Sequence, residues 1–132
     1  MKAHIRPQSP VALVWQLGED DPRRPGLAAA CQKAGLRLRP VLPEDLGRCI
    51  GALCDLPGKY PEEAPAPAQD TLPALVLSGL SNTALDGFLD DLRTQGVDIP
   101  LKAMVTPTNR VWSVQQLLAE LTREHEAFEK TV

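Results

Sequence analysis

Cysteine, histidine and aromatic residues are scarce in this chain of 132 residues. Three cysteines and two histidines, with no C-x-x-C pair, lack the ligand spacing of a structural zinc site, and an odd number of cysteines does not form a complete disulfide framework. We therefore predict no metal and no cofactor. We expect the three thiols, those of Cys31, Cys49 and Cys54, to be buried or idle.

A strong charge of one sign and long apolar runs are also missing. The formal net charge is −3, so no broad cationic field exists to attract nucleic acid or an anionic membrane. No stretch approaches the roughly 20 apolar residues of a membrane-spanning helix, and Pro7 and Pro10 interrupt the first residues before an apolar run of signal-peptide length. These absences predict a cytoplasmic protein with neither a nucleic-acid nor a membrane partner.

What the sequence does contain is an alternation of strand and helix patterns. Short apolar or alternating runs predict strands over residues 11–17, 36–41, 75–78 and 101–106, the second of them an edge strand with a wet face. Helical spacing and helix-start residues predict helices from about 20 to 34, 43 to 56, 81 to 95 and 114 to 130. Strand followed by helix, four times, implies parallel strands joined by right-handed crossovers.

The predicted fold is a single α/β domain over residues 1–132. It has three layers, α/β/α, with a mainly parallel four-stranded sheet in βαβαβαβα order. Five prolines between residues 57 and 73 predict a flexible Pro/Ala-rich connection at about 57–72. Gly47 and Gly51, four residues apart in a predicted helix, indicate either close packing or a weak helix.

The clearest local signal is the start of the last helix. Ser113 and Gln116 have the spacing of a capping box, and Trp112 and Leu117 stand at the positions of a hydrophobic staple. These residues are explained by starting a helix. The residues just before them, 106–110, are not.

A candidate site follows from the rule that ligands of open parallel sheets bind outside the carboxyl ends of the strands. If the third and fourth strands are neighbours, hydroxyl, amide and guanidinium groups there could hold a small anion. The candidate ligand-binding residues are Ser78, Thr106, Thr108, Asn109 and Arg110. The alternative is structural, because Ser, Thr and Asn also occur in such loops to satisfy backbone groups.

Other chemistry finds less support in the sequence. Asp20 and Asp21 could bind Mg²⁺, but acids at a helix start explain them without a metal. Lys102 suits a snorkelling edge lysine, and His125 lies on the apolar face of the last helix without an evident partner. No catalytic residue is predicted, because no serine triad, cysteine nucleophile or phosphate-binding loop can be assembled.

Two resemblances add to this interpretation. The residues from Asp86 to Thr106, in which an Asp-Gly-led helix precedes a strand ending in Thr, resemble part of a response-regulator receiver domain, but Ser78 stands where the phospho-acceptor aspartate is expected. Residues 75–81, Leu85-Asp86, the run Pro-Leu-Lys-Ala-Met-Val-Thr-Pro-Thr-Asn at 100–109 and Trp112 resemble a bacterial family, domain of unknown function 3783. This resemblance implies a small bacterial α/β protein and no assigned activity.

Two functions remain open at this stage. The first is a non-enzymatic binding or interaction module, which could form a homodimer, that uses the surface near residues 106–110. The alternative is an enzyme or sensor for a small anionic ligand held at the carboxyl ends of the strands.

Overall fold

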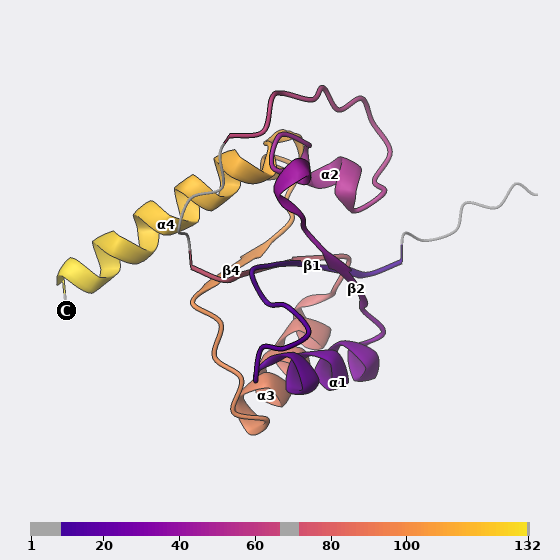
Figure 1. Ribbon diagram of the computed structural model, residues 1–132. Helices are drawn as coiled ribbons and strands as arrows, with labels where there is room; N and C mark the ends of the chain where they lie inside the picture. The colour runs from indigo at the N-terminus through magenta and orange to yellow at the C-terminus, as the bar shows by residue number, and fades with distance from the viewer. Residues whose placement is uncertain (1–8, 67–71, 132) are drawn as a thin grey trace, which may run out of the picture.

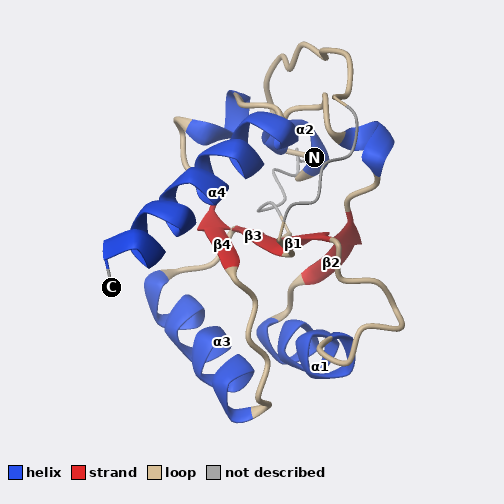
Figure 2. Cartoon of the chain, turned by 60° about the vertical axis from the view of Figure 1, so that its left-hand side comes forward, coloured by secondary structure: helices blue, strands red, loops and turns tan. Residues whose placement is uncertain are grey.

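The computed structural model describes residues 9–66 and 72–131 as a sheet between two layers of helices (Figures 1 and 2). The helices α1 and α3 cover one face of the sheet, and α2 and α4 cover the other (Figure 2). The elements are, in chain order, β1 (Val11–Trp15), α1 (Arg24–Ala34), β2 (Arg37–Pro40), the 3₁₀ helix η1 (Pro43–Asp45), α2 (Ile50–Leu53), β3 (Ala74–Ser78), α3 (Asn82–Thr94), β4 (Leu101–Met104), the 3₁₀ helix η2 (Asn109–Val111) and α4 (Val114–Thr131).

The sheet has four strands, as predicted, but it is mixed. Its order is β2-β1-β3-β4, in which β1 and β2 are parallel, β3 and β4 are parallel, and the central pair β1 and β3 is antiparallel. The prediction of a mainly parallel sheet is therefore wrong. The carboxyl ends of β1 and β2 therefore point towards one end of the sheet along the strand direction, and those of β3 and β4 point towards the opposite end.

The reason for this error lies in the two central strands. Both β1 and β3 are buried along their whole length because helices cover both faces. A strand buried on both faces has a continuous apolar sequence whichever way its neighbour runs, so the apolar pattern does not report direction. The long connection from α2 to β3 lets the chain re-enter the sheet beside β1 in the opposite sense.

Two apolar clusters fill the space between the sheet and its helices. One joins alternate residues of β1 and β3 to α2 and the start of α4, with Val114, Leu117 and Leu118 among its members. The other joins the remaining strand residues to α1 and α3, with Leu27, Phe88 and Leu92. None of the helices in residues 9–66 and 72–131 is long and apolar enough to cross a membrane.

The predicted helix boundaries hold where a capping residue marked them. Gly35 ends α1 in the left-handed conformation, with φ of 73°. The hydroxyl of Ser81 accepts a hydrogen bond from the Ala84 amide at the start of α3, and that of Ser113 accepts one from the Gln116 amide at the start of α4.

The second predicted helix is much shorter than expected, and its two glycines are closely packed. A Cβ added at Gly47 would lie 1.9 Å from the carbonyl oxygen of Glu63, and one added at Gly51 would lie 2.6 Å from the ring of Tyr60. Both glycines therefore make room for the chain that follows α2. The structure shows close packing, one of the two alternatives from the sequence, and the four-residue length of α2 agrees with the other, a weak helix.

The Pro/Ala-rich connection contacts this surface. The amide of Glu63 donates to the Gly47 carbonyl at 2.9 Å, and Gln115 on α4 accepts from the Ala66 amide and donates to Glu63. Residues 67–71 of the predicted flexible connection lie outside the described residues. The flexibility of the connection stays a prediction.

Candidate functional site

The sequence-predicted residues lie at the carboxyl ends of β3 and β4, which are adjacent parallel strands as the prediction required. Ser78 is buried and faces the apolar cluster under α2. Its hydroxyl is hydrogen-bonded to the Cys54 thiol; burial raises the pKa of that thiol to about 11, and the Ser78 bond partly opposes the rise. Ser78 thus has a partner inside the core and does not join the other four residues.

Two of the remaining residues close the loop on itself. Asn109, 9% exposed, accepts a hydrogen bond from the Thr106 amide at 2.8 Å through its Oδ1 and donates to the Met104 carbonyl at 3.0 Å through its Nδ2. The Asn109 amide in turn donates to the Thr106 hydroxyl at 3.0 Å. These bonds satisfy backbone groups that the turn would otherwise leave unpaired.

Thr108 and Arg110 differ from these two. Both are exposed, and within the described residues neither side chain has a hydrogen bond or an ion pair. These two side chains are available to a ligand, and the exposed Thr106 hydroxyl, which accepts one hydrogen bond, can still donate one.

A cavity that the sequence did not indicate lies at the opposite end of the strands. It has a volume of about 380 Å³ and opens at the carboxyl ends of β1 and β2. We call it the β1–β2 crevice. Its lining residues are Val14, Trp15, Gln16, Leu17, Gly18, Glu19, Arg24, Pro40, Val41, Leu42 and Pro43.

The position of this crevice has a topological cause. After β1 the chain turns to α1 on one face of the sheet, and after β2 it turns to η1 and α2 on the other face. The two loops diverge (Figure 2), and residues of both line the crevice. Such switch points are where open α/β sheets bind their ligands.

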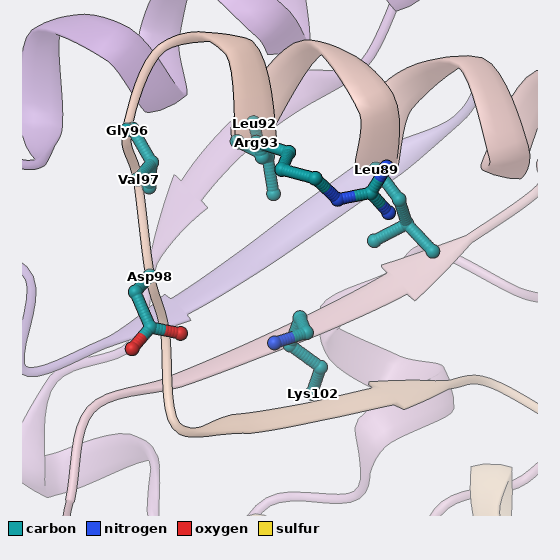
Figure 3. A pocket seen from close by; sticks show the side chains of 7 residues that line it. All are labelled: Leu89, Leu92, Arg93, Gly96, Val97, Asp98 and Lys102. Carbon is teal, nitrogen blue, oxygen red and sulfur yellow. The ribbon is translucent and has the colours of Figure 1, made fainter.

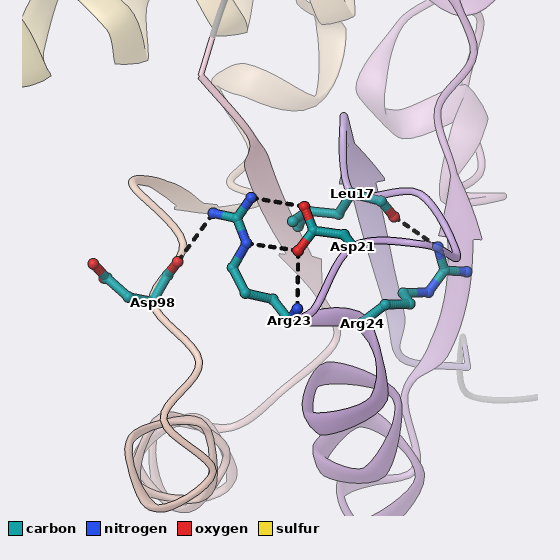
Figure 4. A network of polar contacts seen from close by, with 5 residues as sticks. All are labelled: Leu17, Asp21, Arg23, Arg24 and Asp98. Atoms are coloured by element: carbon teal, nitrogen blue, oxygen red, sulfur yellow. Dashed lines mark hydrogen bonds and ion pairs between the residues drawn. The ribbon is translucent and has the colours of Figure 1, made fainter.

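A polar network lies at the start of α1, next to the crevice residue Arg24 (Figure 4). The carboxylate of Asp21 accepts hydrogen bonds from the backbone amide, Nε and Nη2 of Arg23, at 2.9, 2.9 and 2.8 Å. Arg23 also donates from Nη1 to the Asp98 carbonyl at 3.3 Å. The Arg23 hydrogen bonds hold the pKa of Asp21 at about 2, below its ordinary 3.8.

Arg24 is the cation of the crevice. Its Nη1 donates to the Leu17 carbonyl at 2.7 Å, which fixes the guanidinium beside the loop that follows β1 (Figure 4). Since a guanidinium carries five N–H groups, the others can still bind a ligand. Gln16, with φ of 59°, and Glu19 are exposed on the same loop.

A second cavity, of about 460 Å³, lies between α3 and the start of β4 (Figure 3). Lys102 faces Leu89 and Arg93 across it. Arg93 is paired with Asp90, and Lys102 donates to the Ile99 carbonyl at 2.7 Å, as Arg24 does to that of Leu17. Asp98 and the carboxyl end of α3 add negative potential, so this cavity suits an anion less well than the β1–β2 crevice.

Burial and local contacts account for the three thiols and for His125 within the described residues. All three cysteines are free and buried, and burial raises the pKa of Cys31 to about 11 and raises that of Cys49. The Cys49 thiol donates towards the Pro61 and Val111 carbonyls, both at 3.3 Å. His125 contacts Glu129 one turn further along α4.

The sequence comparisons add a family to this geometry. Residues 73–128 match the family described as Domain of unknown function (DUF3783). This part of the chain is similar to DUF3783 domains. The DUF3783 match covers β3, α3, β4 and most of α4, so it includes the predicted site at 106–110 and excludes the β1–β2 crevice. No curated protein and no solved structure has significant similarity to the chain.

Proposed function

We propose that the protein is a non-enzymatic binding module that holds a small ligand, with an apolar body and one anionic group, in the β1–β2 crevice. The observation that carries the proposal is a cavity at a topological switch point with a fixed guanidinium in its wall. Its volume of about 380 Å³ falls in the usual range for small-molecule sites.

The lining supports this class of ligand. Apolar groups from Val14, Leu17, Val41 and Leu42 provide most of the wall, and specificity in such sites comes from a few polar groups. Arg24 can bind a carboxylate or a phosphate by charge-assisted hydrogen bonds. The carboxylate of Glu19 in the same wall opposes a second negative charge, which favours a monoanion over a dianion.

A thermal-shift and calorimetry experiment tests the proposal. Benzoate serves as the monoanionic probe and phenyl phosphate as the dianionic probe, with benzyl alcohol as the uncharged control. A ligand at about 100 times its dissociation constant stabilises the folded state by about 2.7 kcal/mol. We expect benzoate to raise the melting temperature more than phenyl phosphate, and benzyl alcohol to have the smallest effect.

Two matched variants locate the site. Arg24→Gln removes the cation of the β1–β2 crevice, and Arg110→Gln removes the exposed cation of the predicted site at the other end of the strands. We expect benzoate binding to weaken at least tenfold in Arg24→Gln and to be unchanged in Arg110→Gln. The opposite result would assign the anion to Arg110 and Thr108 and reject the crevice.

The exposure of Arg110 and Val111 favours a second candidate, an interaction surface formed by residues 106–111. Val111 is 54% exposed and directly follows the exposed Arg110, so the loop presents an apolar and a charged side chain to solvent. A homodimer through this surface would appear in light scattering as a mass that increases with concentration, and Val111→Asp would abolish the increase.

A cytoplasmic location and a non-enzymatic role also belong to this proposal. Three buried free cysteines support a reducing compartment such as the cytoplasm. That the protein is not an enzyme stays a prediction, and a panel of hydrolase and transferase substrates tests it.

A further inference from the structure

The two halves of the chain have the same order of elements around a pseudo-two-fold axis. The first runs β1, α1, β2, η1, α2 and the second β3, α3, β4, η2, α4. In the sheet order β2-β1-β3-β4 the halves meet at the antiparallel pair, where Leu13 lies opposite Val76. Residues 11–15 of β1 correspond to 74–78 of β3, so Leu13 and Val76 occupy the same position in their halves, on either side of the axis.

The backbone hydrogen bonds of the two halves also correspond. The carbonyl of the proline before the first strand accepts from the amide that begins the second strand, which is Arg37 to Pro10 in one half and Leu101 to Pro73 in the other. A carbonyl of the first strand accepts from the amide just after the second strand, which is Val41 to Val14 and Val105 to Leu77. A carbonyl near the end of the helix accepts from the amide that follows the glycine, which is Leu36 to Cys31 and Val97 to Leu92.

The contact between the halves is reciprocal. The Ile50 amide donates to the Trp112 carbonyl at 2.9 Å, and the Val114 amide donates to the Arg48 carbonyl at 2.9 Å. Each bond becomes the other when the halves are exchanged, because 48 corresponds to 112 and 50 to 114. Between them lies the antiparallel bridge of Cys49 with Ser113, which also correspond.

The unusual backbone conformations coincide as well. Gly35 and Gly96 follow the two helices with φ of 73° and 71°. Gly79, which follows β3, has φ of 88°, and Gln16, which follows β1, has φ of 59°. A side chain at positive φ is uncommon, and Gln16 has it where the other half has glycine.

We propose that residues 10–54 are a second, diverged copy of the unit that matches DUF3783, and that the β1–β3 seam is the surface by which one such unit binds another. Six identical residues stand at corresponding positions. They are Pro10 and Pro73, Leu17 and Leu80, Gly35 and Gly96, Val41 and Val105, Pro43 and Pro107, and Leu53 and Leu117. The chain is therefore two such units joined covalently, and the partner that fits the β1–β3 seam of one unit is another unit of the same kind.

This correspondence also relates the two candidate sites. Trp15 and Leu42 in the wall of the β1–β2 crevice correspond to Ser78 and Thr106 of the sequence-predicted site. Asp45, whose carboxylate accepts from the Leu42 amide at 3.0 Å, corresponds to Asn109, which accepts from Thr106. The duplication does not depend on whether either candidate site binds a ligand.

Cleavage of the folded protein tests the seam. A protease recognition sequence is inserted in the full chain between residues 69 and 70 and cut after purification. We expect the two pieces to co-elute as a pair and to melt in one transition whose midpoint falls on dilution, while the midpoint of the uncut protein does not change. Separation into two pieces that melt independently would overturn the proposal, and so would loss of the far-ultraviolet circular dichroism signal on cutting.

An exchange between the halves tests their equivalence. The triple variant Leu42→Thr, Glu44→Thr, Asp45→Asn gives residues 42–45 the Thr-Pro-Thr-Asn sequence of 106–109. The control Asp45→Ala removes the acceptor of the Leu42 amide, and both variants remove the ion pair of Asp45 with Arg48. We expect the exchange to lower the melting temperature by less than the control does, because the introduced asparagine closes the loop as Asn109 does. A loss of stability equal to or larger than that of the control would show that the two loops are not equivalent.

Discussion

Replacement of Asn109 by alanine separates a structural role from a ligand-binding role at the predicted site. The substitution removes the acceptor of the Thr106 amide and the donor to the Met104 carbonyl, and it leaves both backbone groups without their partners. An unsatisfied buried polar group costs about 1–3 kcal/mol. Because Thr106 is exposed and water can reach its amide, we expect the lower end of this range, about 1 kcal/mol for each of the two backbone groups and about 2 kcal/mol in all.

Urea unfolding followed by circular dichroism measures this loss. About 2 kcal/mol corresponds to a fall of roughly 6–10 °C in melting temperature for a chain of this size. Thr108→Ala is the matched control on the same loop, and its effect should stay within about 0.5 kcal/mol because its side chain is exposed. Asp45→Ala, which removes one such bond in the other half together with a partly exposed ion pair to Arg48, should cost about 1 kcal/mol. A loss below about 0.5 kcal/mol in Asn109→Ala would refute the structural role.

Three further predictions concern the network, the glycines and the thiols. The pKa of Asp21 is about 2 when folded and 3.8 ordinarily, so its contribution to stability is present above about pH 4 and is lost as the pH falls from about 4 to about 2. Asp21→Asn should therefore be less stable than wild type in urea at neutral pH, with a smaller fall in stability across that acidic range; an unchanged pH profile would contradict this. Gly51→Ala should destabilise the protein by about 1–3 kcal/mol, since the new methyl group meets the Tyr60 ring, but it should be stabilising in a Tyr60→Ala background because alanine favours the helix; equal effects in the two backgrounds would rule out the contact. Ellman's reagent at about pH 8 should label the three thiols slowly in the native protein and rapidly in guanidinium chloride, and a fast native reaction would mean that a thiol is accessible; the thiols are those of Cys31, Cys49 and Cys54.

Local features of this fold could be predicted from the sequence because single residues mark them. Ser81 and Ser113 mark where their helices begin, through side-chain hydrogen bonds, and Gly35 marks where α1 ends, through its left-handed conformation. These features depend on residue type alone. The alternation of Leu and Arg over 36–39 marked an edge strand, and β2 is indeed at an edge of the sheet. These signals act within a few residues of the chain.

Strand direction and the crevice could not be predicted because they depend on contacts that are distant in sequence. The apolar runs of β1 and β3 are compatible with either direction, and the mixed sheet moves the two pairs of carboxyl ends to opposite ends of the sheet. The β1–β2 crevice is built mainly from apolar residues and a loop with an ordinary composition. The one local signal that could have indicated it is Arg24, next to a proline at the start of a helix.

The direct test of the binding proposal is a titration of the ¹⁵N-labelled protein with benzoate, followed by amide chemical shifts. We predict saturable shifts confined to the loops of the β1–β2 crevice, at residues 16–19, Arg24 and residues 41–42, and we predict their loss in Arg24→Gln. Shifts centred on residues 106–110, or the absence of saturable shifts with every probe of the panel, would contradict the account.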